Sequence, residues 1–354
     1  MRLVFTLIII SLIYSCNDTD DVETPSAPLK IASVDLSTLP QLEIENVVFK
    51  DSAYKEKPLL TVLKEAGINN IRLRLWVSPE NKHSSFFEVK KLTKRLQNYG
   101  FTVMLSLHYS DEWADPGNQK KPKSWNNISF NALKDSVYIY SRRVASEIKP
   151  EFIQLGNEIN NGFLKPEGDF WELPLSFVQL LNEANRGVKD ADSSIKTIVH
   201  FAGYKSYFPF LKRADSVNYD FIGLSYYPWW HGIDTTDFNT EILNIHRTFK
   251  KPILFTETAY PFTFGWNDWT NNIVGEKSEL IDAFKASEQG QAMFVKWLVK
   301  LSNHHNFIKG ASYWEGAWIA LKGSQANDGS PWENCALFDF ENRANKALYE
   351  LGKK

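Results

Sequence analysis

The chain contains few cysteines and has almost no net charge, and each of these features excludes a class of protein. Two cysteines, Cys16 and Cys335, occur among 354 residues, which excludes a disulfide-rich scaffold. The formal net charge of -2 gives no indication of a nucleic-acid partner. Beyond the N-terminal segment, no apolar run is long enough to cross a bilayer. We therefore expect a globular, monomeric protein in which Cys335 is a buried structural residue.

Several catalytic signatures are also missing. The first apolar run of the main segment continues into residues 33–37, which contain no glycine, so a phosphate loop is absent there. A doubly wound nucleotide-binding sheet is therefore disfavoured. No H-x-H, H-E-x-x-H or cysteine cluster indicates a zinc site, and no serine nucleophile elbow occurs.

Tryptophan, by contrast, is abundant. The chain contains 12 Trp, and aromatic residues make up 14% of it. Trp113, Trp229 and Trp230 lie in polar segments between apolar runs. Flat, stiff rings stack on the apolar faces of sugars, although loop tryptophans also close the ends of barrels. We treat these three residues as candidates for sugar stacking.

The N-terminal residues have the composition of an export signal. Residues 1–15 contain one early positive charge and an apolar segment too short to span a bilayer. A small residue then precedes Cys16, which resembles the lipobox of bacterial lipoproteins, where the signal is cleaved before a cysteine that carries lipid. Residues 16–29 are polar and contain proline, as in a flexible tether. We expect a bacterial outer-membrane lipoprotein, lipidated at Cys16 and exposed at the cell surface; an ordinary secretory signal is the alternative.

From residue 30 onward, short apolar runs alternate with segments of helical period. The expected strands are 31–36, 70–75, 102–107, 152–155, 197–201, 221–225, 253–255 and 310–314. The longest amphipathic segments between them cover 130–148, 176–191 and 289–301. Eight alternating units predict an α/β fold, a single (β/α)8 barrel that forms one domain over residues 30–354.

Polar side chains collect where these expected strands end. Glu158 follows the fourth run and Glu257 the seventh, and a carboxylate in such a position is costly unless chemistry uses it. Strands four and seven lie on opposite sides of an eight-stranded ring, so the two carboxylates face each other. Such a pair is what hydrolysis of a glycosidic bond requires. The other candidates at the barrel mouth are Arg72, Arg74, His108, Asp111, Asn157, His200, Tyr226, Tyr227 and Trp314.

Two other interpretations of this cluster stay open at this level. The two acids could form structural ion pairs with the arginines, or they could join histidines in a metal site. Scattered histidines on strands are more often hydrogen-bonded support than ligands, so we assign no metal.

Longer motifs surround these candidates. Residues 108–117 read H-Y-S-D-E-W-A-D-P-G and residues 154–162 read Q-L-G-N-E-I-N-N-G. The remaining motifs are I-R-L-R-L-W at 71–76, I-G-L-S-Y-Y-P at 222–228, T-E-T-A-Y-P at 256–261, Y-W-E at 313–315 and W-E-N at 332–334. In this order and over nearly all of 30–350, they resemble glycoside hydrolase family 53, the arabinogalactan endo-β-1,4-galactanases.

The resemblance implies a retaining enzyme that cuts β-1,4-galactan in pectin. It implies that Glu158 is the acid/base and Glu257 the nucleophile. It further implies that five residues support them, with Tyr226 preferred to Tyr227: Arg72, His108, Asn157, Tyr226 and Trp314. A retaining pair should lie about 5–5.5 Å apart.

One segment departs from the family pattern. Bacterial relatives often carry an acidic calcium loop after strand seven, whereas residues 265–272 contain one acid. A hard cation prefers several carboxylate oxygens, so we expect no required cofactor, and calcium only if amide and backbone oxygens complete a site. Two functional alternatives are a non-catalytic glycan-binding lipoprotein and a barrel glycanase for another β-1,4-glycan.

Overall fold

The computed structural model of the protein describes residues 30–353. The predicted signal peptide 1–15, the lipidated Cys16 and the tether 16–29 lie outside the described residues. Among the helices that the structure describes, none combines the length and the apolar character needed to span a membrane.

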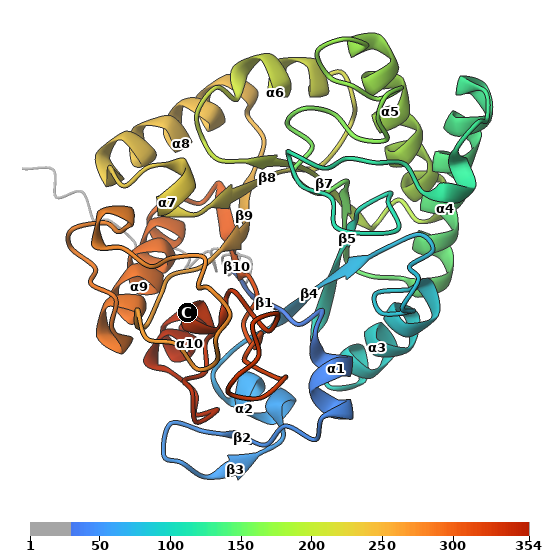
Figure 1. Cartoon of the computed structure of the whole chain (residues 1–354). Helices are drawn as coiled ribbons and strands as arrows, with labels where there is room; N and C mark the ends of the chain where they lie inside the picture. Colours follow the sequence, from blue (N-terminus) through green and yellow to red (C-terminus); the bar gives the residue numbers. More distant parts are fainter. Residues whose placement is uncertain (1–29, 354) are drawn as a thin grey trace, which may run out of the picture.

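Eight parallel strands within residues 30–353 close into a barrel, as predicted (Figure 1). In chain order they are β1 (Ile31–Asp35), β4 (Asn70–Leu75), β5 (Thr102–Leu107), β6 (Phe152–Leu155), β7 (Lys196–Ala202), β8 (Phe221–Tyr226), β9 (Ile253–Thr258) and β10 (Ile308–Tyr313). Each strand pairs with the next along the chain, and β1 closes the ring by pairing with both β10 and β4. A short hairpin of β2 (Phe49–Lys50) and β3 (Glu56–Lys57) lies outside the ring.

Helices surround the strands in an outer ring (Figure 1). They are α1 (Leu39–Ile44), α2 (Leu59–Glu65), α3 (Phe86–Asn98), α4 (Phe130–Ile148), α5 (Pro174–Ala191), α6 (Phe208–Ala214), α7 (Pro228–His231), α8 (Thr235–Phe249), α9 (Glu288–His304) and α10 (Lys346–Leu351). The three long helices agree with the amphipathic segments of the sequence to within a few residues. Ser129 begins α4 because its side chain accepts a hydrogen bond from the amide of Ala132.

Gly67 follows the end of α2 and turns the chain toward β4. Gly67 has a φ of +92°, a backbone conformation that side-chain-bearing residues rarely adopt. A Cβ atom at this position would also lie 2.4 Å from the carbonyl oxygen of Gly352, so the C-terminal residues pack directly against this turn. The chain then enters β4 three residues later.

The core has two layers. The larger one fills the space between strands and helices, whereas a small cluster inside the barrel contains Met104, Ile198 and Leu254. These three residues lie on alternate strands, as expected for one layer of side chains inside a (β/α)8 barrel. Because side chains alternate along a strand, Ser106 and His108 share the inward face with Met104, and His200 shares it with Ile198. The inside of the barrel is therefore apolar at the bottom and polar toward the C-terminal ends of the strands.

Candidate active site

A cavity of about 630 Å³ opens at the C-terminal ends of the strands. Its lining combines acids, cations and indole rings: Arg72, Arg74, His108, Trp113, Asn157, Glu158, Tyr227, Trp230, Glu257, Trp314, Trp318 and Trp332, with several smaller side chains. Both predicted glutamates are nearly buried there, at 9% exposure for Glu158 and 6% for Glu257. Function in this fold gathers at this end of the barrel.

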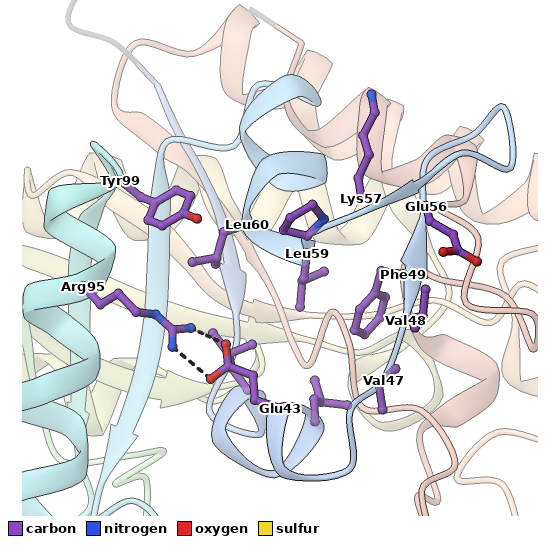
Figure 2. A pocket seen from close by; sticks show the side chains of 13 residues that line it. Glu43, Val47, Val48, Phe49, Glu56, Lys57, Leu59, Leu60, Arg95 and Tyr99 are labelled. Carbon is purple, nitrogen blue, oxygen red and sulfur yellow. Dashed lines mark hydrogen bonds and ion pairs between the residues drawn. The ribbon is translucent and has the colours of Figure 1, made fainter.

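A second cavity, of about 550 Å³, lies on the outside of the barrel between α1, the β2–β3 hairpin, α2 and α3 (Figure 2). Aliphatic side chains such as Leu59 and Leu60 form much of its wall. Its edge carries an ion pair between Arg95 and Glu43, whose closest atoms are 2.5 Å apart. Glu43 is paired with Arg95, and Glu56 is exposed at the surface, so this cavity offers no buried pair of carboxylates.

Arg72 is the centre of the charged network beneath the active-site cavity. Its Nη2 lies 2.6 Å from Oε1 of Glu257, and its Nη1 lies 2.6 Å from Oδ2 of the fully buried Asp35. Arg72 also donates to Gln154 and Asn157. The sequence left both Arg72 and Arg74 as candidates at the barrel mouth, and the resemblance implied Arg72 as a supporting residue. Arg74 lies beside Glu315, at 3.7 Å, and not beside Glu257.

Tyr227, not Tyr226, contacts Glu257. The Tyr227 hydroxyl donates to Oε2 of Glu257 at 3.0 Å, whereas the Tyr226 hydroxyl donates to the carbonyl of Gly232. The ring of Tyr226 packs on Phe238 of α8. The preference for Tyr226 was therefore wrong. Alternation along β8 places Tyr227 on the same face as Ser225, and this period of two was the signal that could have identified it.

An irregularity in β9 turns Glu257 toward the barrel mouth. Leu224 of β8 pairs with Phe255, but the next residue, Ser225, pairs with Glu257, so one residue of β9 is skipped. Such a bulge reverses the alternation of side chains, because strict alternation would place Leu254 and Glu257 on opposite faces. The strand also extends to Thr258, three residues beyond its predicted end, so Glu257 lies within the strand.

Glu158 has a different environment from Glu257. Its backbone adopts φ of +47°, which is uncommon for a residue with a side chain and frequent at functional sites. Oε1 accepts a short hydrogen bond from the hydroxyl of Ser225, and no cation forms a salt bridge with Glu158 among the described residues. Burial, followed by the charge of Glu257, raises the pKa of Glu158 to about 8.

The pKa of Glu257 is also raised by burial, but Arg72 opposes this rise and Tyr227 adds a hydrogen bond to the ionised form. A single proton shared by the two acids therefore belongs on Glu158, because only Glu257 has a guanidinium partner. One carboxylate oxygen of each residue lies within 4.8 Å of the other. The pair thus contains one acid that holds a proton and one base that does not.

The same geometry disfavours a metal in this position. Glu158, His200 and Glu257 form the one cluster of acids and histidines in residues 30–353 that is compact enough to hold a cation. However, both ring nitrogens of His200 and both oxygens of Glu257 already have hydrogen-bond partners in the protein. Oε2 of Glu158 has no hydrogen-bond partner within residues 30–353, and one oxygen does not make a cation site.

His108 and Asn157 connect the acids to the surrounding loops. Nδ1 of His108 accepts from the indole of Trp76 and from the amide of Ala114, so the hydrogen of its neutral ring lies on Nε2. Burial, followed by the charge of Arg72, keeps the pKa of His108 well below its usual value. Asn157 donates from its amide to the carbonyl of Ala114, which fixes the loop after β5 above the cavity.

Three of the predicted aromatic residues line the cavity: Trp113, Trp230 and Trp314. Trp113 covers the guanidinium of Arg74 at 4.2 Å and lies nearly parallel to Trp318, with ring centroids 6.1 Å apart. Trp318 and Trp332 were not selected from the sequence. They lie in the long segment after β10, where no strand or helix pattern indicated which side chains turn inward.

Besides Tyr226 and His200, two further predicted residues do not line the cavity, Trp229 and Asp111. Trp229 packs, half-buried, against the core beside Tyr227. The carboxylate of Asp111 accepts hydrogen bonds from the amides of Ser78 and Lys123, so it joins two loops. A carboxylate directly after a strand can serve the adjacent backbone as well as a ligand, and the sequence does not distinguish the two.

Comparison with known proteins identifies the family to which this chain belongs. The family model of glycosyl hydrolase family 53 matches residues 31–351. The chain belongs to this family. It is 31% identical to an arabinogalactan endo-beta-1,4-galactanase of Cellvibrio japonicus, over 89% of this chain and 87% of that protein. It is 33% identical to the endo-beta-1,4-galactanase of Bacillus subtilis strain 168, over 82% of this chain and 71% of that one.

A solved family 53 catalytic domain, from Ignisphaera aggregans, has the same fold. It superposes with a TM-score of 0.84 at 35% identity, covering 92% of this chain and 97% of that domain. Membership in the family and the barrel with its paired acids make this protein a glycoside hydrolase.

The loop after β9 is the segment in which the sequence departs from the acidic calcium loop that the resemblance led us to expect. Asp268 of this loop and Glu333 of the segment after β10 are both buried and lie close together, and each has one carboxylate oxygen without a hydrogen-bond partner in the described residues. Burial and the neighbouring Asp268 raise the pKa of Glu333. Two carboxylates fit a hard cation only in part, because such an ion takes six to eight oxygens.

Proposed function

We propose that this family 53 protein hydrolyses internal β-1,4-galactosidic bonds of galactan and arabinogalactan, the side chains of pectin, with retention of configuration. The observation that carries this proposal is the asymmetric pair of acids, Glu158 without a cation and Glu257 bound to Arg72, within 4.8 Å of each other. Inverting enzymes hold their carboxyl groups about 6.5–9.5 Å apart to admit a water, and retaining enzymes about 5–5.5 Å apart. The galactan specificity is supported by the names of the relatives.

In the first step, Glu257 attacks the anomeric carbon while the glycosidic oxygen leaves. Glu158 gives its proton to that oxygen, so the leaving group departs as a neutral alcohol. Arg72 and Tyr227 keep Glu257 ionised until a covalent galactosyl ester forms.

In the second step, the ionised Glu158 takes a proton from an incoming water molecule. The resulting hydroxide attacks the same anomeric carbon and displaces Glu257. Two inversions give net retention, and both acids return to their starting states. The rise in the pKa of Glu158 to about 8 suits a group that must first give and then accept a proton near neutral pH.

The polysaccharide would lie across the indole rings of the cavity. Trp230 is half exposed, and Trp113 and Trp318 present a broad aromatic wall beside the acids. An open cavity lined with such rings suits internal cleavage of a chain rather than removal of a terminal sugar.

Release of reducing ends from purified galactan, arabinogalactan, mannan, xylan and cellulose tests the substrate. We expect cleavage of the two galactans alone. Cleavage of another polysaccharide in their place would identify a different glycanase, and binding without cleavage would identify a glycan-binding protein. Proton NMR of the first product tests retention, because a retaining enzyme releases the β-anomer before mutarotation.

Substitution of each glutamate by alanine tests the roles of the two acids. Glu257→Ala should lose at least about a thousandfold in kcat, and azide should restore turnover with an α-galactosyl azide as product. Glu158→Ala with azide should give the β-azide instead. Identical azide products from both variants would contradict the division of roles.

We further propose that the protein is a lipoprotein of the bacterial outer membrane, attached through Cys16 and facing outward. The sequence pattern before Cys16 supports this. Cys16→Ala should release the protein from the membrane fraction, and protease treatment of intact cells should digest the wild-type protein. Protection from protease in intact cells would contradict surface exposure.

A further inference from the structure

Four buried side chains connect the two acids from below. Arg72 donates from Nε to Oε1 of Gln154 at 2.6 Å, and Nε2 of Gln154 lies 2.8 Å from Nδ1 of His200. Nε2 of His200 lies 2.9 Å from Oγ of Ser225, which contacts Oε1 of Glu158. Arg72 is 1% exposed, and Gln154, His200 and Ser225 are 0% exposed, so the protein itself must supply their partners.

The direction of every hydrogen bond in this series of side chains follows from Arg72, its first member. A guanidinium has no acceptor, so Gln154 must turn its oxygen to Arg72 and its amide hydrogens to His200. Nδ1 of His200 therefore accepts. The backbone amide of Glu158 also points at Nδ1, at 3.3 Å, and is a second donor that requires the same assignment.

The remaining hydrogens are then determined. The neutral imidazole carries its hydrogen on Nε2 and donates it to Ser225, whose own hydrogen is left for Glu158. Oε1 of Glu158 thus receives a hydrogen and does not carry one. Oε2 makes no hydrogen bond to residues 30–353, and Glu158 lines the cavity.

We propose that Arg72, Gln154, His200 and Ser225 form a one-way hydrogen-bond chain that holds the catalytic proton of Glu158 on Oε2, the oxygen available to the substrate. Ser225 and Gln154 are positioning residues in this scheme, because they act through Glu158 and His200. The chain also links the acid to the nucleophile, since Arg72 holds Glu257 at its other end. The proposal rests on the hydrolytic roles of the two glutamates.

The chain resists protonation of His200. An imidazolium would carry a hydrogen on Nδ1, facing two donors, the amide of Gln154 and the backbone of Glu158. Burial, followed by the charge of Arg72, keeps the pKa of His200 well below its usual value. The direction of the chain is therefore the same throughout the pH range in which Glu158 titrates.

The tautomer of His200 tests the proposal without any substrate. Long-range proton–nitrogen correlation spectra of the full chain, labelled with ¹⁵N-histidine, distinguish the two neutral forms, and a His200→Gln sample assigns the signal. We expect neutral His200 with its hydrogen on Nε2 from about pH 5 to pH 8, in contrast to a free histidine, which titrates there. A hydrogen on Nδ1, or titration in that range, overturns the proposal, whatever the substrate proves to be.

Gln154→Glu should reverse the direction of the hydrogen bonds between residue 154, His200 and Ser225. A carboxylate has no hydrogen to donate, and a charged acceptor at the position of the 2.8 Å contact outweighs the backbone amide of Glu158 at 3.3 Å. His200 would then carry its hydrogen on Nδ1 and accept at Nε2 from Ser225, which no longer donates to Glu158. We expect the His200 signal to change to the Nδ1–H form in this variant. An unchanged Nε2–H signal would show that Gln154 does not set the direction.

Ser225→Ala tests the effect on the acid, with Ser312→Ala as its matched control. Ser312 is also a fully buried strand serine, but its hydroxyl has no partner in the described residues. Loss of the Ser225 donor should raise the pKa of Glu158 and thereby shift the alkaline limb of the pH profile of kcat/KM upward by about one pH unit. We also expect kcat to fall about tenfold while KM changes by no more than about twofold. Ser225→Thr should recover most of the loss.

Ser312→Ala should have the same acid and alkaline limbs of the pH profile of kcat/KM as the wild type. An unshifted alkaline limb in Ser225→Ala, or the same shift in Ser312→Ala, would overturn the role of Ser225. If the wild-type protein cleaves no galactan at all, the proposed function fails, and the tautomer of His200 still decides the direction of the chain.

Discussion

Nη2 of Arg72 lies 2.6 Å from Oε1 of Glu257, and the guanidinium is almost completely buried between this acid and Asp35. The ion pair is one-sided, because Glu158 has no equivalent cation in the described part of the chain. Two carboxylates that are close neighbours in one cavity are thereby made chemically different. The separate roles that we propose for them rest on this contact, because only Glu257 is bound to the guanidinium.

Arg72→Lys should impair both catalysis and stability. A lysine keeps the charge but cannot contact Asp35, Glu257 and Gln154 together, so buried acceptors lose their donors. We expect the free energy of unfolding to fall by about 2–3 kcal/mol, the range of one hydrogen bond to a charged group. Chemical denaturation measures the stability, and a kcat at least about tenfold lower on galactan measures the catalytic loss. Wild-type stability in this variant would contradict the network.

The pH dependence of kcat/KM should reflect the two acids separately. In the proposed mechanism Glu158 must be protonated, and its pKa is raised to about 8, so activity should fall by half near pH 8 as the proton is lost. Activity also needs Glu257 ionised, so the acid limb reports the lower-titrating member of the pair. Initial rates at substrate concentrations well below KM measure both limbs. An alkaline limb near the usual pKa of a free glutamate, about 4.3, would contradict this assignment.

Tyr227→Phe and Tyr226→Phe form a matched pair of neighbours. The first removes the donor to Glu257, which raises the pKa of that acid and moves the acid limb to higher pH. We expect kcat to fall about tenfold as well. The second removes a hydrogen bond to the carbonyl of Gly232, outside the cavity, and should leave kinetics unchanged. Equal effects of the two substitutions on the acid limb would be incompatible with the structure.

Trp113→Ala and Trp229→Ala distinguish a cavity wall from a packing residue. Loss of the Trp113 ring should raise KM for galactan several-fold, because a sugar stacked on this ring would lose about 1 kcal/mol or more of binding free energy. Trp229 does not line the cavity, so its loss should lower thermal stability with little change in KM. A larger rise in KM for Trp229→Ala would reverse these assignments.

Removal of divalent cations should leave the chemistry intact. The proposed steps use two carboxylates and a water molecule, and every possible ligand atom of Glu158, His200 and Glu257 except Oε2 of Glu158 already has a protein partner. Exhaustive treatment with a chelator should leave kcat within about twofold of the untreated enzyme. A loss of activity that calcium restores would show that Asp268 and Glu333 belong to a cation site, and would contradict the expectation of no required cofactor.

Local sequence patterns determined much of the scaffold. The strands at 70–75, 102–107 and 152–155 have the bounds that their apolar runs predicted, and α4 covers the predicted 130–148. Such segments are predictable because burial and period are properties of a few consecutive residues. The same patterns placed Glu158 and Glu257 at strand ends, and the longer motifs around them indicated the family.

Tertiary structure decided how those residues meet. The skipped residue in β9 depends on the register of β8, so nothing within β9 alone predicts that Glu257 turns inward. The selection of Tyr227 follows from the face that Ser225 occupies. The chain from Arg72 through Gln154, His200 and Ser225 draws each member from a different strand. The sequence by itself placed two acids at one barrel mouth and, through the family resemblance, implied their roles. Only the closed barrel, by setting which side chains face each other, decided that the guanidinium of Arg72 contacts Glu257 and not Glu158.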